Sequence, residues 1–241
     1  MTTVELGNAT IRYDDTGDGP AVLLLAPGGL RNSRAEMWAN TPWNPVEALA
    51  GRYRVVAMDQ RNTGTSFAPV TGADGWDTYM ADQLALMDHL GIERFAVMGM
   101  CIGGAFIAKL LTIAPERVTA AVAMQPIGLD DNQAVFDGLF DAWRDDVRAD
   151  HPEASDADWA SMKANLFGGG SYLWSVPDDV VPSIGRPLLV LRGDDEFHPA
   201  STSERLAAEV PGAQLVQRWK DGEHVAACRA EVDRFLDAHA T

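Results

Sequence analysis

The sequence predicts an α/β protein built on an open, mostly parallel sheet of about eight strands, with helices on both faces. Short apolar runs at residues 21–26, 54–58 and 118–124 support this fold class. Strands that are covered on both faces read as continuous apolar runs rather than as alternating ones. Segments with helical spacing of apolar residues lie between these runs, and such alternation is typical of parallel sheets.

The individual elements follow from local patterns along the chain. Asp77 is expected to cap the helix that carries Met80, Leu84 and Met87, and Gly91 is expected to end it. The expected strands are residues 3–6, 10–14, 21–26, 54–58, 95–98, 118–124, 187–191 and 214–219, and the expected helices are residues 45–50, 77–90, 105–113, 201–210 and 224–239.

Residues 127–185 differ from the rest and are predicted to form a helical cap or lid. No strand pattern occurs there, acidic residues cluster in 141–158, and three glycines follow at 168–170. The sheet domain then consists of residues 1–126 and 186–241. Aromatic side chains of the lid either line a pocket or pack the lid onto the body, which is the commoner role. They are Phe136, Phe140, Trp143, Trp159, Phe167, Tyr172 and Trp174.

Composition restricts the partners of the chain to small molecules. The net charge of −16 over 241 residues repels phosphate, so we expect neither nucleic acid nor an anionic membrane as a partner. No apolar run is long enough to span a bilayer, and no secretory signal pattern opens the sequence. Two cysteines, Cys101 and Cys228, give no disulfide framework and suit a reducing, cytoplasmic location. The sequence leaves open whether the chain forms a homo-oligomer.

The stretch from Gly99 to Gly104 is the strongest functional signal. It reads Gly-Met-Cys-Ile-Gly-Gly between an apolar strand pattern and a helical pattern, which is the form of a nucleophile elbow with cysteine in place of serine. A thiol at a helix N-terminus meets the positive end of the helix dipole, which favours the nucleophilic thiolate. The other interpretation of Cys101 is a small buried residue in a tight turn. Cys228 fits the apolar face of the last helix and is interpreted as core.

A cysteine nucleophile needs a base and a group that orients the base. His198 and His224 are the two histidines that remain after those within helices, at the terminus and in the lid are set aside. His224 follows an expected strand and opens the last helix, so we expect it to reach the strand ends. Asp194, Asp195 and Glu196 follow another expected strand and supply the acid.

At this point the chain resembles the α/β-hydrolase superfamily over nearly its whole length. The resemblance lies in the opening turn and strand, in a D-x-R-x-x-G-x-S loop, in the elbow, and in the order of nucleophile, acid and histidine. These motifs are residues 17–20 with 22–25, 59–66, 99–104, 193–195 and 222–224. Cysteine at the elbow resembles the dienelactone hydrolases and the longer polyester synthases, since most members carry serine. Pro27-Gly28-Gly29-Leu30 stands where the family often has His-Gly.

The resemblance implies a hydrolase with Cys101 as nucleophile, His224 as base and Asp195 as acid. Pro199, four residues beyond Asp195, favours this acid, whereas the distance from Gly193 favours Glu196. An oxyanion hole is expected from the backbone N–H of Ile102 and from that of Gly29 or Leu30.

The expected substrates of this hydrolase are activated carboxylic esters, lactones or thioesters, which would pass through an acyl-thioester. The aromatic lid suggests an apolar acyl or ring group. An acyltransferase that uses the same thioester, and a ligand-binding member without catalysis, are the alternatives. We expect no cofactor and no metal, because Asp194, Glu196 and His198 do not form a ligand-spacing pattern.

Overall fold

The structure, a computed structural model that describes residues 2–241, contains an eight-stranded sheet in the order β1-β2-β4-β3-β5-β6-β7-β8. β1 pairs antiparallel with β2 and β2 antiparallel with β4, while the other neighbours run parallel. This confirms the predicted fold class. The strands are β1 (Thr2–Leu6), β2 (Ala9–Thr16), β3 (Ala21–Leu25), β4 (Arg54–Met58), β5 (Phe95–Cys101), β6 (Val118–Pro126), β7 (Leu188–Leu191) and β8 (Gln214–Val216).

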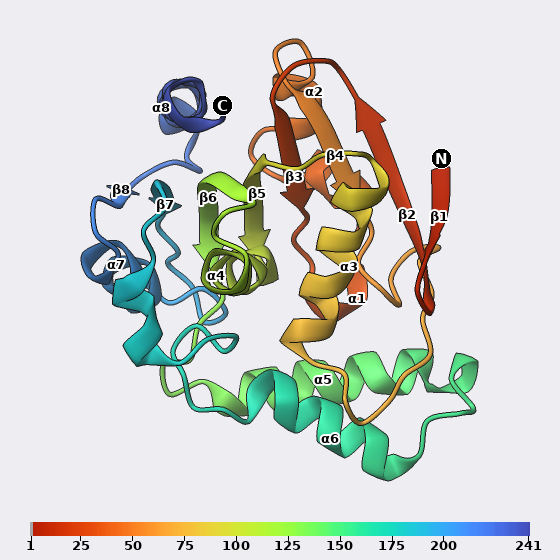
Figure 1. Cartoon of the computed structure of the whole chain (residues 1–241). Helices are drawn as coiled ribbons and strands as arrows, with labels where there is room; N and C mark the ends of the chain where they lie inside the picture. The colour runs from red at the N-terminus through yellow and green to blue at the C-terminus, as the bar shows by residue number, and fades with distance from the viewer. Residues whose placement is uncertain (1) are drawn as a thin grey trace.

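Helices cover both faces of the sheet because alternate strand residues point to opposite sides. In β3, Leu23 and Leu25 pack into a core with α3, α4 and α7, whereas Val22 and Leu24 pack into a second core with α2 and α8. Figure 1 shows α3 and α4 in front of the sheet. The helices of the body are α1 (Gly29–Asn32), η1 (Ala35–Asn40), α2 (Pro45–Leu49), α3 (Trp76–His89), α4 (Ile102–Ile113), α7 (Ala200–Glu209) and α8 (Gly222–His239).

The segment between β6 and β7 carries helices and lies across one end of the sheet. It contains α5 (Gln133–Val147), η2 (Arg148–Asp150), α6 (Asp156–Phe167) and η3 (Asp178–Ser183). Figure 1 shows α5 and α6 side by side below the sheet, at the end toward which the arrows of β5 and β6 point. We call residues 127–185 the lid segment, and its position places it over the carboxyl ends of the parallel strands, where ligands bind in such folds.

Local details differ from the expectations at several places, among them the short helices α1 and η1, which were not expected, and β6, which runs to Pro126. β8 ends at Val216 rather than at residue 219, because Trp219 turns back and its indole N–H donates to Arg192 O at 2.8 Å. Asp77 lies in the first turn of α3, and the N-cap is Gly75, whose N–H donates to Thr78 Oγ1 at 3.2 Å. The predicted burial of Cys228 in the core is confirmed. Of the helices in the described part of the chain, none combines the length and apolar character needed to cross a bilayer.

The segment after β4 holds the loop after β3 in place. The N–H of Gln60 donates to Ser33 O at 2.8 Å, which ties the two loops together. The next residue, Arg61, is buried and pairs with Asp82 at 2.8 Å and with Asp74 at 3.3 Å. Removal of one partner from a buried ion cluster of this kind strongly destabilises the folded protein, because the remaining charges are then buried without a counter-charge. The D-x-R-x-x-G-x-S loop is therefore a support for the strand-end loops.

Candidate active site

Cys101 is the last residue of β5 and stands at the sharp turn into α4, which begins at Ile102. Its backbone has φ 61° and ψ −119°, a conformation that non-glycine residues rarely adopt and that marks functional sites. The turn requires glycine on both sides. A Cβ atom on Gly103 would lie 2.6 Å from Leu25 O, and one on Gly99 would lie 2.8 Å from Gly103 O. The close packing of strand, turn and helix thus projects the thiol from the sheet edge.

The surroundings of Cys101 favour its thiolate form. Burial by itself would raise the pKa of the thiol, but His198 and two nearby backbone N–H groups together outweigh burial and lower the pKa below its ordinary value. The backbone N–H groups of Gly28 and Ile102 face the sulfur and also contribute to the lower pKa of the thiol. The side chain is half-buried, so a substrate can reach the sulfur.

His198 is held between Asp195 and Cys101. Its Nδ1 lies 2.7 Å and 2.9 Å from the two carboxylate oxygens of Asp195. Burial would lower the pKa of the imidazole, but the thiol and the carboxylate outweigh burial and raise that pKa. Nε2 is buried and makes no hydrogen bond of ordinary geometry with residues 2–241, although the ring and the thiol shift each other's pKa. A loose contact between nucleophile and base is usual before substrate binds.

Asp195 is fixed in turn by the loop after β7. The backbone N–H groups of Phe197 and His198 each donate to Asp195 Oδ1 at 3.0 Å. Burial would raise the pKa of Asp195, but the bonds to His198 outweigh it and lower the pKa, which keeps the carboxylate ionised. The two neighbouring acids make no hydrogen bond to a histidine within residues 2–241: the Asp194 carboxylate pairs with Lys220, and the bond made by Glu196 is to its backbone carbonyl, which accepts from Asn132 at 2.7 Å. Of the three acids that the sequence left open, Asp195 is thus the one that contacts a histidine ring.

The structure does not bring His224, the expected base, to Cys101. It lies in the first turn of α8, does not line the cavity at Cys101, and has a buried Nδ1 with Glu223 Oε1 3.7 Å away. The residue of its loop that reaches the strand ends is Lys220, whose Nζ bonds Gln125 Oε1 at 3.1 Å and also pairs with Asp194. The histidine that faces Cys101 across the cavity is His198. The loop after β7 forms a tight turn in which Asp195 and His198 exchange backbone hydrogen bonds, and this turn directs the ring of His198 toward the sheet.

The three residues expected to supply the oxyanion hole, Ile102, Gly29 and Leu30, all line the cavity at Cys101. The backbone N–H groups that face the resting sulfur are those of Ile102 and of Gly28, which was not among the expected donors. Gly28 has φ 119°, and a Cβ atom there would lie 2.6 Å from the Asn32 side chain. This turn, which only glycine tolerates, aims the Gly28 N–H at the thiol. Gly29 and Leu30 line the cavity beside it.

A cavity of about 190 Å³ opens beside the thiol, and its surface is largely apolar. The lid supplies Phe136, Leu139, Phe140 and Phe167, while the body supplies the strand-end loops. The other lid aromatics are buried and pack: Trp143 contacts Trp159 with ring centroids 5.7 Å apart. The lid aromatics thus divide between the two expected roles. The full lining is Gly28, Gly29, Leu30, Cys101, Ile102, Ile127, Phe136, Leu139, Phe140, Phe167, Phe197 and His198.

Sequence reasoning did not assign Gly28, Phe197, Leu139 and Ile127 to this site, and it kept His198 as a candidate but favoured His224 as the base. His198 carried a usable signal, because a histidine three residues after an acid in a strand-end loop can face that acid. The cavity residues carried none beyond their apolar character, because only the packing of the lid brings them to the thiol.

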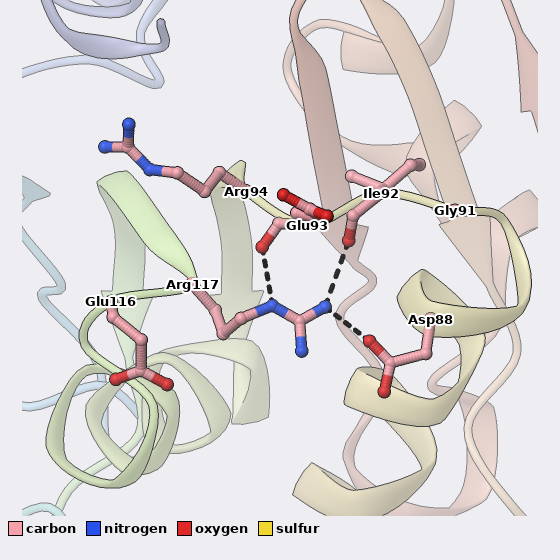
Figure 2. A pocket seen from close by; sticks show the side chains of 7 residues that line it. All are labelled: Asp88, Gly91, Ile92, Glu93, Arg94, Glu116 and Arg117. Atoms are coloured by element: carbon pink, nitrogen blue, oxygen red, sulfur yellow. Dashed lines mark hydrogen bonds and ion pairs between the residues drawn. The ribbon is translucent and has the colours of Figure 1, made fainter.

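A wider hollow of about 550 Å³ lies at the opposite end of the sheet, near the start of β5. Figure 2 shows Arg117 at its centre, with its guanidinium bonded to the backbone carbonyls of Glu93 and Ile92 and to the Asp88 carboxylate. These bonds join the loop before β6, which carries Arg117, to the end of α3 and to the loop before β5. The hollow is therefore a structural junction, and the thiol site is the one that holds reactive groups.

A family model described as the alpha/beta hydrolase fold matches residues 21–172 of the chain. The chain therefore belongs to the α/β-hydrolase family. A protein of Synechocystis sp. that is provisionally named a non-heme chloroperoxidase is 30% identical, over 89% of this chain and 89% of the relative. The 2-hydroxy-6-oxo-6-phenylhexa-2,4-dienoate hydrolase of Burkholderia cepacia is 26% identical, over 91% of this chain and 88% of the relative.

Solved structures show the same fold. The enol-lactonase from Burkholderia xenovorans LB400 superposes with a TM-score of 0.73 at 20% identity, covering 98% of this chain and 100% of that structure. A meta-cleavage product hydrolase from Pseudomonas fluorescens IP01 gives a TM-score of 0.74 at 21% identity, covering 99% and 98%. The lid segment and the sheet thus occur together in proteins of this family.

Proposed function

We propose that the protein is a cysteine hydrolase that cleaves activated carboxylic esters, lactones or thioesters through an acyl-thioester on Cys101. His198 acts as base and acid, and Asp195 orients its ring. The observation that carries the proposal is the contact chain from Asp195 through His198 to Cys101, in which the pKa of the thiol is lowered and the pKa of the imidazole is raised. The family and its hydrolase-named relative support an enzyme that acts on ester-type bonds.

The reaction follows from the positions of these groups. The Cys101 thiolate attacks the acyl carbonyl, and the negative oxygen that results accepts hydrogen bonds from the N–H of Gly28 and Ile102. The protonated His198 then gives its proton to the leaving oxygen or sulfur, and the bond from carbonyl carbon to leaving group breaks. Water attacks the thioester, His198 takes a proton from that water, and the acid departs while the thiolate is restored.

The thiolate also determines the preferred bonds. A thiolate leaves a tetrahedral intermediate readily, so the intermediate reverts unless the substrate's own leaving group is equally good. Esters with activated alcohols, enol lactones and thioesters meet this condition, whereas amides do not.

A free thiol of this kind stays reduced in a reducing compartment, which supports a cytoplasmic location.

Mass spectrometry of the intact protein tests the proposal with p-nitrophenyl hexanoate, mixed rapidly and quenched in acid. We expect a hexanoyl adduct on the wild-type chain and on the matched control Cys228→Ala, and none on Cys101→Ala. Cys228 is a buried core thiol whose pKa is raised by burial to about 12, so it cannot compete. A wild-type protein that releases p-nitrophenol without any adduct on Cys101 would remove the covalent mechanism.

An acyltransferase that uses the same thioester is the second candidate. Few polar side chains line the apolar cavity, so an alcohol or thiol acceptor can compete with water there. Product analysis with and without added n-butanol separates the two functions. Hexanoic acid as the main product in both cases supports hydrolysis, whereas butyl hexanoate in large excess supports acyl transfer.

A further inference from the structure

We infer that the acyl part of the substrate is small and uncharged, an apolar group of about six carbons or one ring, and that acyl groups with a second carboxylate are excluded. This inference rests on the proposed function, since it names the substrate class of the same site. Three independent features of the cavity carry it: its volume, the chemistry of its lining, and the charges that surround its entrance.

The volume limits the acyl group. A closed apolar cavity of roughly 150 Å³ lined by Leu, Ile and Phe holds one benzene molecule. The cavity at Cys101 measures about 190 Å³, well under the roughly 300–1,000 Å³ of pockets for drug-sized ligands. A six-carbon chain or a single ring therefore fills it, and a ten-carbon chain must leave several methylenes in the entrance. The four lid side chains Phe136, Leu139, Phe140 and Phe167 form the wall that sets this limit.

The lining offers no partner for a charged acyl group. Within the described chain, the titratable side chains at the cavity are Cys101 and His198, and both are used by the reaction. Arg31 and Arg34 follow the oxyanion loop, but neither lines the cavity. Arg31 pairs with Asp146, and Arg34 pairs with Glu36 at 2.9 Å. A carboxylate in the cavity would thus be buried without a counter-charge, which costs far more than burial of a neutral group.

The surroundings of the loop after β7 oppose anions as well. A second hollow at this loop is lined by the carboxylates of Asp130, Asp131, Asp194, Asp195 and Glu196, in a chain of net charge −16. The one cation in its lining, Arg192, pairs with Glu204 at 2.8 Å. Charges of one sign around a site lower the local concentration of ligands with the same sign. An anionic substrate is therefore repelled before it reaches the apolar cavity.

The entrance is marked by two exposed apolar side chains. Leu139 on α5 and Phe197 beside His198 both line the cavity, yet 47% and 37% of their surfaces remain exposed. Exposed large apolar residues beside a pocket favour contact with apolar ligands. Leu139 belongs to α5 and not to the loop that carries Asp195 and His198, so a charge can be added at this position without changing the sequence of that loop.

Matched p-nitrophenyl esters test the inference by kcat/KM: acetate, hexanoate, decanoate and the monoester of adipic acid. The adipate monoester has the hexanoyl length with a carboxylate at its end. We expect kcat/KM for the hexanoate to be about a hundredfold or more above that for the adipate monoester, because the carboxylate of the adipate monoester is buried without a counter-charge. The kcat/KM for the hexanoate should also be higher than the values for the acetate and the decanoate. An adipate monoester within threefold of the hexanoate, or a faster decanoate, overturns the inference.

A variant pair locates the cause of the charge discrimination. Leu139→Arg places a cation at the entrance, and Ile113→Arg makes the same change at another exposed apolar helix residue, which is 53% exposed and does not line the cavity. Leu139→Arg should narrow the hexanoate-to-adipate ratio by about tenfold at low salt, and Ile113→Arg should leave it unchanged. Equal changes of the hexanoate-to-adipate ratio in both variants would contradict the inference that the entrance determines the discrimination against charged acyl groups.

A binding measurement separates this inference from the proposed function. Hexanamide and adipic acid monoamide are titrated into Cys101→Ala and followed by two-dimensional NMR of the backbone amides. Hexanamide should bind at least about tenfold more tightly, with shifts in the lid segment and the loop after β7. Absence of ester turnover together with this preference would reject the proposed function and keep the inference. Equal affinities, or shifts remote from the cavity, would reject the inference whether or not esters are cleaved.

Discussion

Replacement of His198 by glutamine, with His224→Gln as the matched control, is the most direct test of the site. His198 contacts both Asp195 and Cys101, whereas His224 contacts neither of them and does not line the cavity. Glutamine approximates the size of the ring but cannot take or give a proton. The same substitution is thus made at both histidines, and the difference in rate between the two variants measures the contribution of proton transfer by His198.

The magnitude follows from the burial of the ring. A positioned acid or base contributes roughly 10²–10⁴-fold to the rate. Only 10% of the His198 side chain is exposed, so bulk water has little access to replace it, and we expect a loss near the upper end, about 10³–10⁴-fold in kcat/KM. At 1.36 kcal/mol per tenfold this corresponds to about 4–5.5 kcal/mol of transition-state stabilisation. His224→Gln should change the rate by no more than about threefold.

The assay is the hydrolysis of p-nitrophenyl hexanoate at pH 7.5, after circular dichroism has shown that both variants are folded. Single-turnover measurements then separate acylation from deacylation, and both steps should be slow in His198→Gln because the same ring serves both. A loss of a thousandfold in His224→Gln with near-normal activity in His198→Gln would refute the assignment of the base.

Three further predictions concern the thiol and its supports. Because the pKa of Cys101 is lowered, the thiolate persists at pH values below 9.0, the ordinary pKa of a thiol. In a plot of the iodoacetamide alkylation rate against pH, the midpoint of the rise should therefore lie below pH 9.0 in the wild type and should move to higher pH in His198→Gln. Arg61→Met leaves two buried aspartates unpaired and should lower the free energy of unfolding by about 3–5 kcal/mol in urea denaturation, whereas Arg148→Met breaks an exposed pair and should cost less than about 1 kcal/mol. Gly103→Ala places a methyl group 2.6 Å from Leu25 O and should lower stability by about 1–3 kcal/mol with loss of activity, so a variant of wild-type Tm and rate would contradict the close packing at the elbow.

The sequence by itself determined the fold class, most of the strands and helices, and the sharp strand-to-helix turn at Cys101. These features depend on interactions close together in the chain, such as apolar runs in buried strands, helical spacing, and glycines around a tight turn. Asp195 could be favoured for the same reason, since its loop follows a strand directly.

Only the tertiary structure decided which histidine meets Cys101, which N–H groups face the sulfur, and which lid residues enclose the cavity. His198 and His224 both follow strands at the same sheet edge, so local pattern does not separate them. The two histidines are separated by the direction of each loop after its strand. The His198 N–H donates to Asp195, which holds His198 close to the sheet, whereas in the loop before α8 it is Lys220 and not His224 that contacts the end of β6, at Gln125. The cavity depends on contacts between segments far apart in the chain, and packing against the sheet fixes these contacts in a way that spacing along one segment cannot.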